Sequence, residues 1–456
     1  MLTSEGIRYS WEQILQRVGL TAQLSRQAIV LQYQEPIESC DPSMLCIRVH
    51  HSDVEQWHAL LKLEAGSLGW VDAKSLLPPG SIFTDLANIP VLFPAHETFP
   101  PGRLIEYNQR QNTLAVNFDL IAATYIMLTR WEETIIPVRD AHDRFPAAAS
   151  TAYRQGFLSQ PVIDQYALIL RAWLQVILPG LKVNPRQYQL QVSHDIDHLG
   201  NNHRPILNGM KQLKDHLAHW DATILRDDWR HILAGDGVIA NTWAALQLVN
   251  WAQELNVRPR FYLMAATKSK FNEGYDPGSP DEQNLIRSIL APGFEIGLHA
   301  GYETMLNTDL LANEKERLEK AVGSPVNAIR QHYLRARVPE TWQAWEKTGF
   351  THDASLGFAD ITGFRCGTCH PYNLFDHLND RVLEVTEEPL IVMDTTLLGK
   401  QKTDFQAAET EILKLAAQCR SVGGVLSLLW HNNSLVHNRY HWGRFYYSLV
   451  PKLLAS

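Results

Sequence analysis

The chain has 456 residues, a formal net charge of −8, 45% hydrophobic residues and 20% charged residues. This is the composition of an ordinary globular protein, and an acidic balance without a long basic run argues against nucleic acid as the main partner. Five cysteines are an odd number in a chain of this length, which argues against a disulfide framework.

The start of the chain, MLTSEGIRYSWEQILQRVGL, lacks a basic segment followed by an apolar core, so we predict no secretory signal. The most apolar long stretch, residues 114–131, is interrupted by Asn117, Asp119 and Arg130. It falls short of the about 20 apolar residues that a membrane span needs. We therefore expect a cytoplasmic protein without a transmembrane segment.

The first part of the chain predicts a small α/β unit with no evident chemistry. The expected helices cover residues 10–18, 54–63, 120–133 and 163–177, and the expected strands cover 28–34, 45–50, 89–94 and 114–119. The last of these helices ends at Pro179-Gly180, a typical helix stop. We therefore place an N-terminal α/β domain over residues 1–180 and a second domain over 181–456.

In the second domain, strands and helices alternate. One expected strand begins at residue 190, and the others cover 260–265, 294–299, 326–333, 390–394 and 424–432. The expected helices cover 242–255, 281–290, 309–322, 340–347, 403–420 and 444–454. Such alternation predicts parallel strands with helices outside them, and the number of repeats favours a barrel-like β/α architecture over an open sheet. The stretch 201–240 between them is predicted to form a lid.

The strand that begins at Leu190 runs into His194, Asp195, Asp197 and His198. In an extended chain the two aspartates point to the same face, because side chains alternate with a period of two. Two carboxylates on one face repel each other unless a cation or a shared proton lies between them. The pattern indicates metal binding or acid–base chemistry, with a strand end carrying solvated charges as the alternative.

Three other predicted strands also end in ionisable residues. His299 ends the expected strand over 294–299, Arg330 and His332 lie near the end of that over 326–333, and His431 lies near the end of that over 424–432. In β/α barrels the site lies at the C-terminal ends of the strands, where segments remote in sequence meet. We therefore expect these side chains to converge with the two aspartates.

The segments SHDIDH, EIGLHAGYE, IRQHYLR, THDASLGF and LSLLWHN, in this order, resemble the ordered motifs of polysaccharide deacetylases, the carbohydrate esterase family 4 or NodB-homology superfamily. The resemblance covers roughly residues 190–456. More loosely, FDLIAATYIMLTRWEE followed by DAHDRF resembles an accessory domain that precedes this module in some bacterial relatives. The resemblance implies an α/β fold: a distorted (β/α) barrel of polysaccharide-deacetylase type with an N-terminal α/β accessory domain.

The resemblance also implies roles for individual residues. Asp195 matches the family's catalytic base, and Asp197 matches a ligand of its divalent metal, usually zinc. His299 matches the first of two metal-binding histidines. Arg330 matches the arginine that orients and tunes the base, and His431 matches the general acid.

A carboxylate normally orients that general acid, and Asp353 and Asp394 are both candidates, each also predicted to lie on the substrate side of the site. His370 and Tyr372, in the Gly-rich aromatic loop GFRCGTCHPYNLF, are predicted to contact the substrate. The CGTC motif of this loop is interpreted as part of the rim of the site, because a lone C-x-x-C is weak support for redox or metal chemistry.

This chain departs from the family pattern at the metal ligands. Glu303 stands where the second metal histidine is expected, and His332 stands where the third motif usually has proline. We expect His332 to replace the missing imidazole, which gives Asp197, His299 and His332 as the ligands. Glu303 is the rival third ligand, because carboxylates also bind zinc.

The activity that the resemblance implies is hydrolysis of an N-acetyl or O-acetyl group on a carbohydrate or glycoconjugate, dependent on Zn²⁺ or another divalent metal. A zinc-bound water has a pKa near ~7, so Asp195 can take its proton while His431 protonates the leaving group. Two alternatives are a metal-free amidohydrolase at the same site and a non-catalytic glycan-binding or assembly protein on a deacetylase-like barrel.

Overall fold

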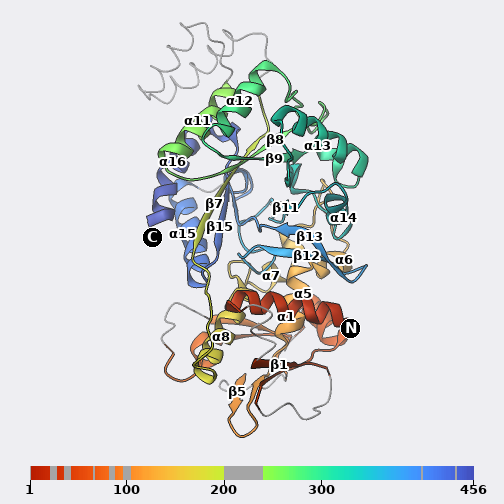
Figure 1. Ribbon diagram of the computed structural model, residues 1–456, viewed down its shortest axis with the longest axis vertical. Helices are drawn as coiled ribbons and strands as arrows, with labels where there is room; N and C mark the ends of the chain where they lie inside the picture. Colours follow the sequence, from red (N-terminus) through yellow and green to blue (C-terminus); the bar gives the residue numbers. More distant parts are fainter. Residues whose placement is uncertain are drawn as a thin grey trace. The chain divides into compact units, whose positions relative to one another are not determined.

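In a computed structural model the chain forms two compact units (Figure 1). The first unit contains Met1–Gln189, Gly363–Pro389 and Leu415–Leu426, and the second contains Leu190–Thr362, Leu390–Lys414 and Ser427–Ser456. The described residues are 2–20, 28–34, 43–64, 67–81, 88–95, 104–199, 240–401, 404–436 and 439–455. The predicted lid over 201–240 lies outside the described residues, apart from its last residue.

The first unit combines two small sheets, a hairpin and several helices. Its strands are β1 (Ile29–Gln32), β2 (Leu45–Val49), β3 (Leu68–Asp72), β4 (Asn88–Leu92), β5 (Ile105–Asn108), β6 (Thr113–Val116), β12 (Tyr372–Asp376) and β13 (Arg381–Glu387). Its helices include α1 (Ser4–Val18), α3 (Val54–Lys62), α4 (Ala73–Leu76), α5 (Leu120–Leu128), α6 (Trp131–Ile135), α7 (Thr151–Arg154) and α8 (Val162–Ile177). One sheet has the order β1-β2-β6-β5, in which only β5 is antiparallel to its neighbour. Strands β3 and β4 form an antiparallel pair, as do β12 and β13.

The predicted helix over 120–133 is two helices. Helix α5 is buried at every residue, as its apolar sequence dictates, and Asp119 caps its start by accepting the Ala122 N–H at 2.8 Å. The chain then breaks at Arg130, whose φ of 53° lies in the left-handed region that non-glycine residues rarely adopt. Its buried guanidinium donates to Glu132 at 2.6 Å and to Glu133 at 2.8 Å, and these ion pairs hold the break in place.

A segment remote in sequence completes this buried ion cluster. Arg365 donates to both carboxylate oxygens of Glu133, at 3.0 and 2.7 Å, across a separation of 232 residues. Nearby, Tyr9 of α1 donates its hydroxyl to the carbonyl of Asn373 at 2.7 Å. These contacts explain why Gly363–Pro389 packs within the first unit, which the sequence pattern did not indicate.

We predict that Glu133→Gln destabilises the first unit, because it removes the buried carboxylate that pairs with both Arg130 and Arg365. Breaking a buried ion pair from one side costs about 3–5 kcal/mol. Urea-induced unfolding, followed by fluorescence and circular dichroism, measures the loss. The control is Glu5→Gln, which removes an exposed ion pair with Arg8 and should change the stability by less than about 1 kcal/mol. Equal effects of the two variants would contradict the prediction.

The second unit is built on parallel strands. They are β7 (Gln189–Ile196), β8 (Arg260–Met264), β9 (Glu295–Ala300), β10 (Ala328–Gln331), β11 (His352–Asp353), β14 (Val392–Met393) and β15 (Val425–Leu429). Their spatial order is β11-β10-β9-β8-β7-β15-β14. The pairings from β7 through to β11, and that of β14 with β15, are all parallel.

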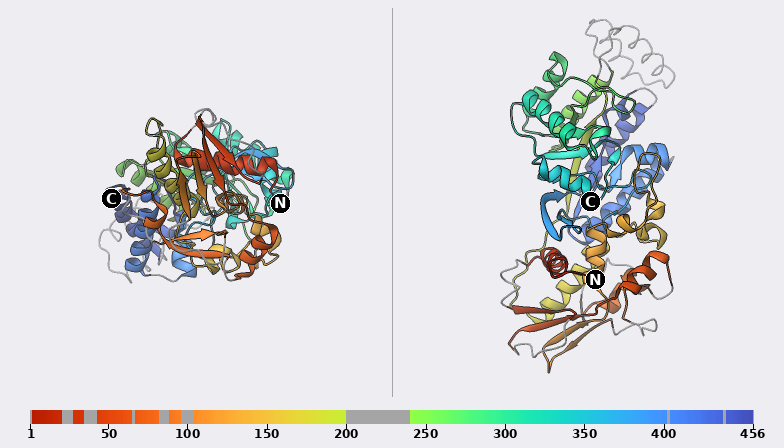
Figure 2. Two further views of the ribbon diagram at one scale, coloured as in Figure 1. Left: turned by 90° about the horizontal axis from the view of Figure 1, so that it is seen from below. Right: turned by 90° about the vertical axis from the view of Figure 1, so that its right-hand side faces the viewer.

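Helices make the crossovers that parallel strands require (Figures 1 and 2). They are α11 (Ala240–Glu254), α12 (Pro280–Leu290), α13 (Thr308–Val322), α14 (Glu340–Lys347) and α15 (Phe405–Ser421), and a further helix, α16 (Tyr440–Ala455), follows β15. The predicted α/β architecture with parallel strands is therefore confirmed. The described strands form an open row, so the sheet is curled without being a closed barrel.

The parallel register gathers the C-terminal ends of the strands at one edge. On β9, His299 is level with Met264 of β8 on one side and with Arg330 of β10 on the other. On β7, Asp195 is level with Tyr262 of β8. Side chains at these positions therefore face a common region, although they are far apart in the sequence. Among the described residues, no helix has the length and hydropathy needed to cross a membrane.

Candidate metal and acid–base site

Ionisable side chains at or just after the C-terminal ends of β7, β9, β10 and β15 meet around the carboxylate of Asp197. Its Oδ1 lies 3.0 Å from Nε2 of His299 and 3.9 Å from Nε2 of His332. Its Oδ2 lies 3.8 Å from Nε2 of His431, which is also 3.8 Å from Oδ2 of Asp195. The structure thus brings together the predicted base, general acid and three of the four candidate ligands.

The contact between His299 and Asp197 joins two hydrogen-bond acceptors. Nδ1 of His299 lies 3.0 Å from the carbonyl oxygen of Arg330, so the ring proton belongs on Nδ1 and Nε2 presents a lone pair. Nε2 and Oδ1 of Asp197 are both buried without a hydrogen-bond partner. Burial by itself lowers the pKa of His299, but the carboxylates of Asp195 and Asp197 outweigh it and raise this pKa. A proton or a cation is therefore favoured between the two atoms.

The residues present fit a divalent cation. Ligand atoms of Asp197, His299 and His332 all lie within 4.8 Å of one another. Burial lowers the pKa of His332 to about 4, so that its ring is neutral and able to donate a nitrogen lone pair. One carboxylate and two imidazoles form a ligand set that suits zinc and leaves a position open.

Glu303 is not part of this group. Its Oε2 accepts a hydrogen bond from Nδ2 of Asn272 at 2.5 Å. Of the two predicted third ligands, the structure therefore brings His332 to Asp197 and His299. Glu303 contacts Asn272, and Asn272 in turn contacts His332.

Asp195 forms a buried ion pair with Arg330. Nη1 of the arginine donates to Oδ1 of Asp195 at 2.8 Å and to the hydroxyl of Ser193 at 3.0 Å, and Nε donates to the carbonyl of Ala354 at 2.9 Å. The guanidinium also stacks over the ring of Tyr262 at 4.2 Å. Burial would raise the pKa of Asp195, but Arg330 and the nearby histidines outweigh burial and lower it. Asp195 is thus kept ionised.

The surroundings of His431 favour its protonated form. Asp394 accepts its Nδ1–H at 2.6 Å and its backbone N–H at 2.9 Å, which fixes the ring with Nε2 toward Asp195 and Asp197. Burial would lower the pKa of His431, but Asp394, Asp197 and Asp195 raise it to about 10. Of the two carboxylates considered as partners of this histidine, the structure pairs it with Asp394.

Asp353 serves another purpose. Its buried carboxylate accepts the hydroxyl of Ser355 at 2.6 Å and the backbone N–H of the same residue at 3.1 Å. Ser355 in turn accepts the backbone N–H of Gln331 at 2.9 Å. Asp353 therefore supports the end of β10, next to Arg330.

His370 and Tyr372 are not brought to the cluster. Both belong to the first unit and are only 2% exposed. Nε2 of His370 lies 3.3 Å from the carbonyl of Val422, within the same unit. Burial raises the pKa of the Cys366 thiol in the same loop, which disfavours the reactive thiolate. The loop that was interpreted as a rim is thus a packed part of the first unit.

Sequence reasoning missed three residues that shape the surroundings of His299. Gln331 donates to the carbonyl of Gly301 at 2.7 Å and to the hydroxyl of Thr304 at 2.8 Å. Glu314 accepts the N–H of Gly301 at 2.8 Å, and burial raises its pKa to about 7. Asn272 contacts His332. The position of Gln331 at a strand end was an available signal, whereas Glu314 lies within α13 and Asn272 within a loop, where no local pattern marks them.

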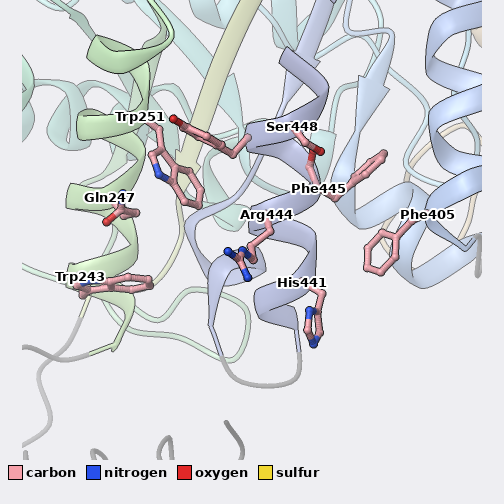
Figure 3. A pocket seen from close by; sticks show the side chains of 9 residues that line it. Trp243, Gln247, Trp251, Phe405, His441, Arg444, Phe445 and Ser448 are labelled. Atoms are coloured by element: carbon pink, nitrogen blue, oxygen red, sulfur yellow. The ribbon is translucent and has the colours of Figure 1, made fainter. Parts of the chain in front are cut away.

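A hollow of about 670 Å³ lies elsewhere in the second unit, between α11 and α16 (Figure 3). Its lining residues are Trp243, Gln247, Trp251, Phe405, His441, Arg444, Phe445, Tyr447 and Ser448. None of them belongs to the cluster around Asp197. The ionisable cluster at the strand ends is therefore separate from this hollow.

Comparison with protein families matches residues 20–179 to a "Family of unknown function (DUF7033)". This match lies within the first unit and covers less than half of the chain. A search of curated proteins finds no significant relative.

Comparison with solved structures finds likenesses that cover about 60% of this chain. A Mycobacterium smegmatis protein described as a polysaccharide deacetylase has 17% identity and a TM-score of 0.38, with 60% of this chain and 85% of the other covered. A 4-alpha-glucanotransferase from Thermococcus litoralis has 12% identity and a TM-score of 0.36, with 59% and 38% covered. A family 4 carbohydrate esterase from Streptomyces lividans has 12% identity and a TM-score of 0.29, with 59% and 87% covered. Since these TM-scores lie below 0.5, we draw neither fold nor activity from these likenesses.

We predict that Asp394→Asn lowers the pKa of His431. The substitution removes the strongest of the charges that favour the imidazolium, whereas burial continues to favour the neutral ring. Titration of the metal-free protein, followed by the NMR signals of the His431 ring, measures the change. Asp353→Asn is the control, since Asp353 contacts Ser355 and should leave this titration in place. An unchanged titration in Asp394→Asn would contradict the pairing.

Proposed function

We propose that the second unit is a metal-dependent hydrolase that removes an N-linked or O-linked acetyl group from a carbohydrate or glycoconjugate. The observation that carries this proposal is the meeting of Asp195 and His431, with Oδ2 and Nε2 3.8 Å apart, beside three residues that fit a metal. Asp195 is kept ionised and His431 is kept protonated, both beside a set of residues that fits a metal. An ionised carboxylate and a protonated imidazole side by side are the groups that a general base and a general acid require. The acetyl group and the carbohydrate come from the resemblance of the motifs.

Each residue has one task in this proposal. Asp195, held ionised by Arg330, accepts a proton from the attacking water. His431, oriented by Asp394 through Nδ1, donates the proton on Nε2 to the leaving nitrogen or oxygen. The protonation states needed at the start are those that the surroundings favour at neutral pH. After the reaction Asp195 holds a proton and His431 lacks one, and proton exchange with solvent restores both groups.

Asp197, His299 and His332 would hold the metal, which when bound would polarise the acyl carbonyl and lower the pKa of a water. A cation there would also satisfy the lone pairs of His299 and Asp197, which have no hydrogen-bond partner. The carbonyl of Arg330 fixes the orientation of His299, so that the residue that keeps Asp195 ionised also supports a ligand.

The proposed activity is tested by measuring the release of acetate from a panel of N-acetylated and O-acetylated oligosaccharides, with zinc present. We expect release by the wild type and a loss of about 10²–10⁴-fold in Asp195→Asn, which lacks the proton acceptor. Retained zinc binding in Asp195→Asn would show that the site is intact. Full activity of this variant would contradict the role of Asp195, and no release from any substrate by the wild type would contradict the hydrolase itself.

Metal content tests the ligand set separately from activity. Elemental analysis after zinc loading and gel filtration should give about one zinc per chain for the wild type. His299→Ala, Asp197→Ala and His332→Ala should each lose most of it. Glu303→Ala should lose less than His332→Ala, because Glu303 does not face the other ligand atoms. The reverse ranking of these two variants would make Glu303 the third ligand.

A further inference from the structure

Asn272 is a buried side chain that contacts the site and has no role in the chemistry described above. It lies in the loop between β8 and α12 and is 3% exposed. Its Oδ1 accepts the backbone N–H of Tyr302 at 2.9 Å and lies 3.0 Å from Nδ1 of His332. Its Nδ2 donates to Glu303 at 2.5 Å. Every polar atom of this amide therefore faces a partner.

The orientation of the amide is settled by groups that have only one possible role. A backbone N–H can only donate, so the atom that faces Tyr302 must be the amide oxygen. The atom that faces Glu303 is then the amide nitrogen, which donates to this carboxylate. The side chain cannot be flipped without placing donor against donor and acceptor against acceptor.

This orientation determines which nitrogen of His332 carries the proton. Since Oδ1 of Asn272 is an acceptor, the hydrogen bond at 3.0 Å requires the proton on Nδ1 of His332. Nε2 then presents its lone pair on the side of Asp197. His299 has the same arrangement, with the carbonyl of Arg330 as its acceptor. The chain thus supplies one acceptor for each imidazole, from the backbone in one case and from a side chain in the other.

We propose that Asn272 is the positioning residue that prepares His332 as a metal ligand, and that Glu303 acts through it. Glu303 fixes the amide, the amide fixes the His332 tautomer, and the tautomer presents a lone pair to the metal. Glu303, which stands in place of the family's second metal histidine, thus orients the ligand His332 without binding the metal itself. The inference rests on the proposed metal site, although the tautomer of His332 is a property of the metal-free protein.

Two measurements on purified full-length protein test this role. The first is the NMR determination of the ¹⁵N shifts of His332 in the metal-free protein, which distinguishes a protonated Nδ1 from a protonated Nε2. The second is the dissociation constant for zinc, measured by competition with a chelator. The variants are Asn272→Leu, which has a similar size but no acceptor, and the double variant Asn272→Asp with Glu303→Gln. The double variant exchanges amide and carboxylate and restores each donor–acceptor pair.

We expect the wild type to hold the proton on Nδ1. Asn272→Leu should release it to Nε2, on the side of Asp197, and should weaken zinc binding about 10–100-fold. The double variant should recover the Nδ1 proton and most of the affinity. Asn307→Ala is the control for general destabilisation, because it removes only the cap of α13 and should leave the tautomer and the zinc affinity unchanged.

The results separate this inference from the proposed function. An unchanged tautomer and zinc affinity in Asn272→Leu would overturn the role of Asn272. Failure of the double variant to recover either property would overturn the path from Glu303 to His332. If the wild type bound no zinc, the proposed function would fail, and the tautomers of the wild type and of Asn272→Leu would still decide whether Asn272 positions His332.

Discussion

The site depends on a contact that is unfavourable by itself. Nε2 of His299 and Oδ1 of Asp197 lie 3.0 Å apart, both are buried, and neither has a hydrogen-bond partner. Two acceptors at this distance repel each other, and burial prevents water from separating them. The fold maintains the contact because β7 and β9 place both residues at strand ends that the parallel register holds level. Such a contact is stable only with a positive charge between the two atoms, whether a proton or a metal ion.

Asp195 and His431, beside this contact, each form an ion pair with a residue of opposite charge. Arg330 neutralises Asp195, and Asp394 stabilises the protonated form of His431. Without these partners, burial would neutralise both residues, since it favours an uncharged carboxyl and an uncharged imidazole. The same pairing that makes the charges tolerable in the interior therefore keeps Asp195 ionised and His431 protonated.

In the first unit, too, buried charges are paired with each other, in a setting without evident chemistry. Arg130, Glu133 and Arg365 form an ion cluster in a packed interior, and the cluster joins a segment from late in the sequence to the N-terminal helices. The positive φ of Arg130 belongs to this arrangement. Helical periodicity, which predicted one continuous helix over 120–133, does not register this break, because the break depends on the side-chain ion pairs of Arg130 with Glu132 and Glu133 and not on the spacing of apolar residues.

The sequence by itself determined the local elements and the ends of the strands. Apolar runs that stop at Asp195, His299, Arg330 and His431 were sufficient to predict parallel strands and to gather these residues at one edge, because side-chain alternation and strand ends are local properties. Only the tertiary structure showed that His332 lies beside Asp197 and His299 while Glu303 contacts Asn272, and that Asp394 is the carboxylate that contacts His431. It also placed His370 in the other unit and revealed Asn272. Each of these outcomes depends on which donor faces which acceptor across the fold, and no spacing along the chain records that.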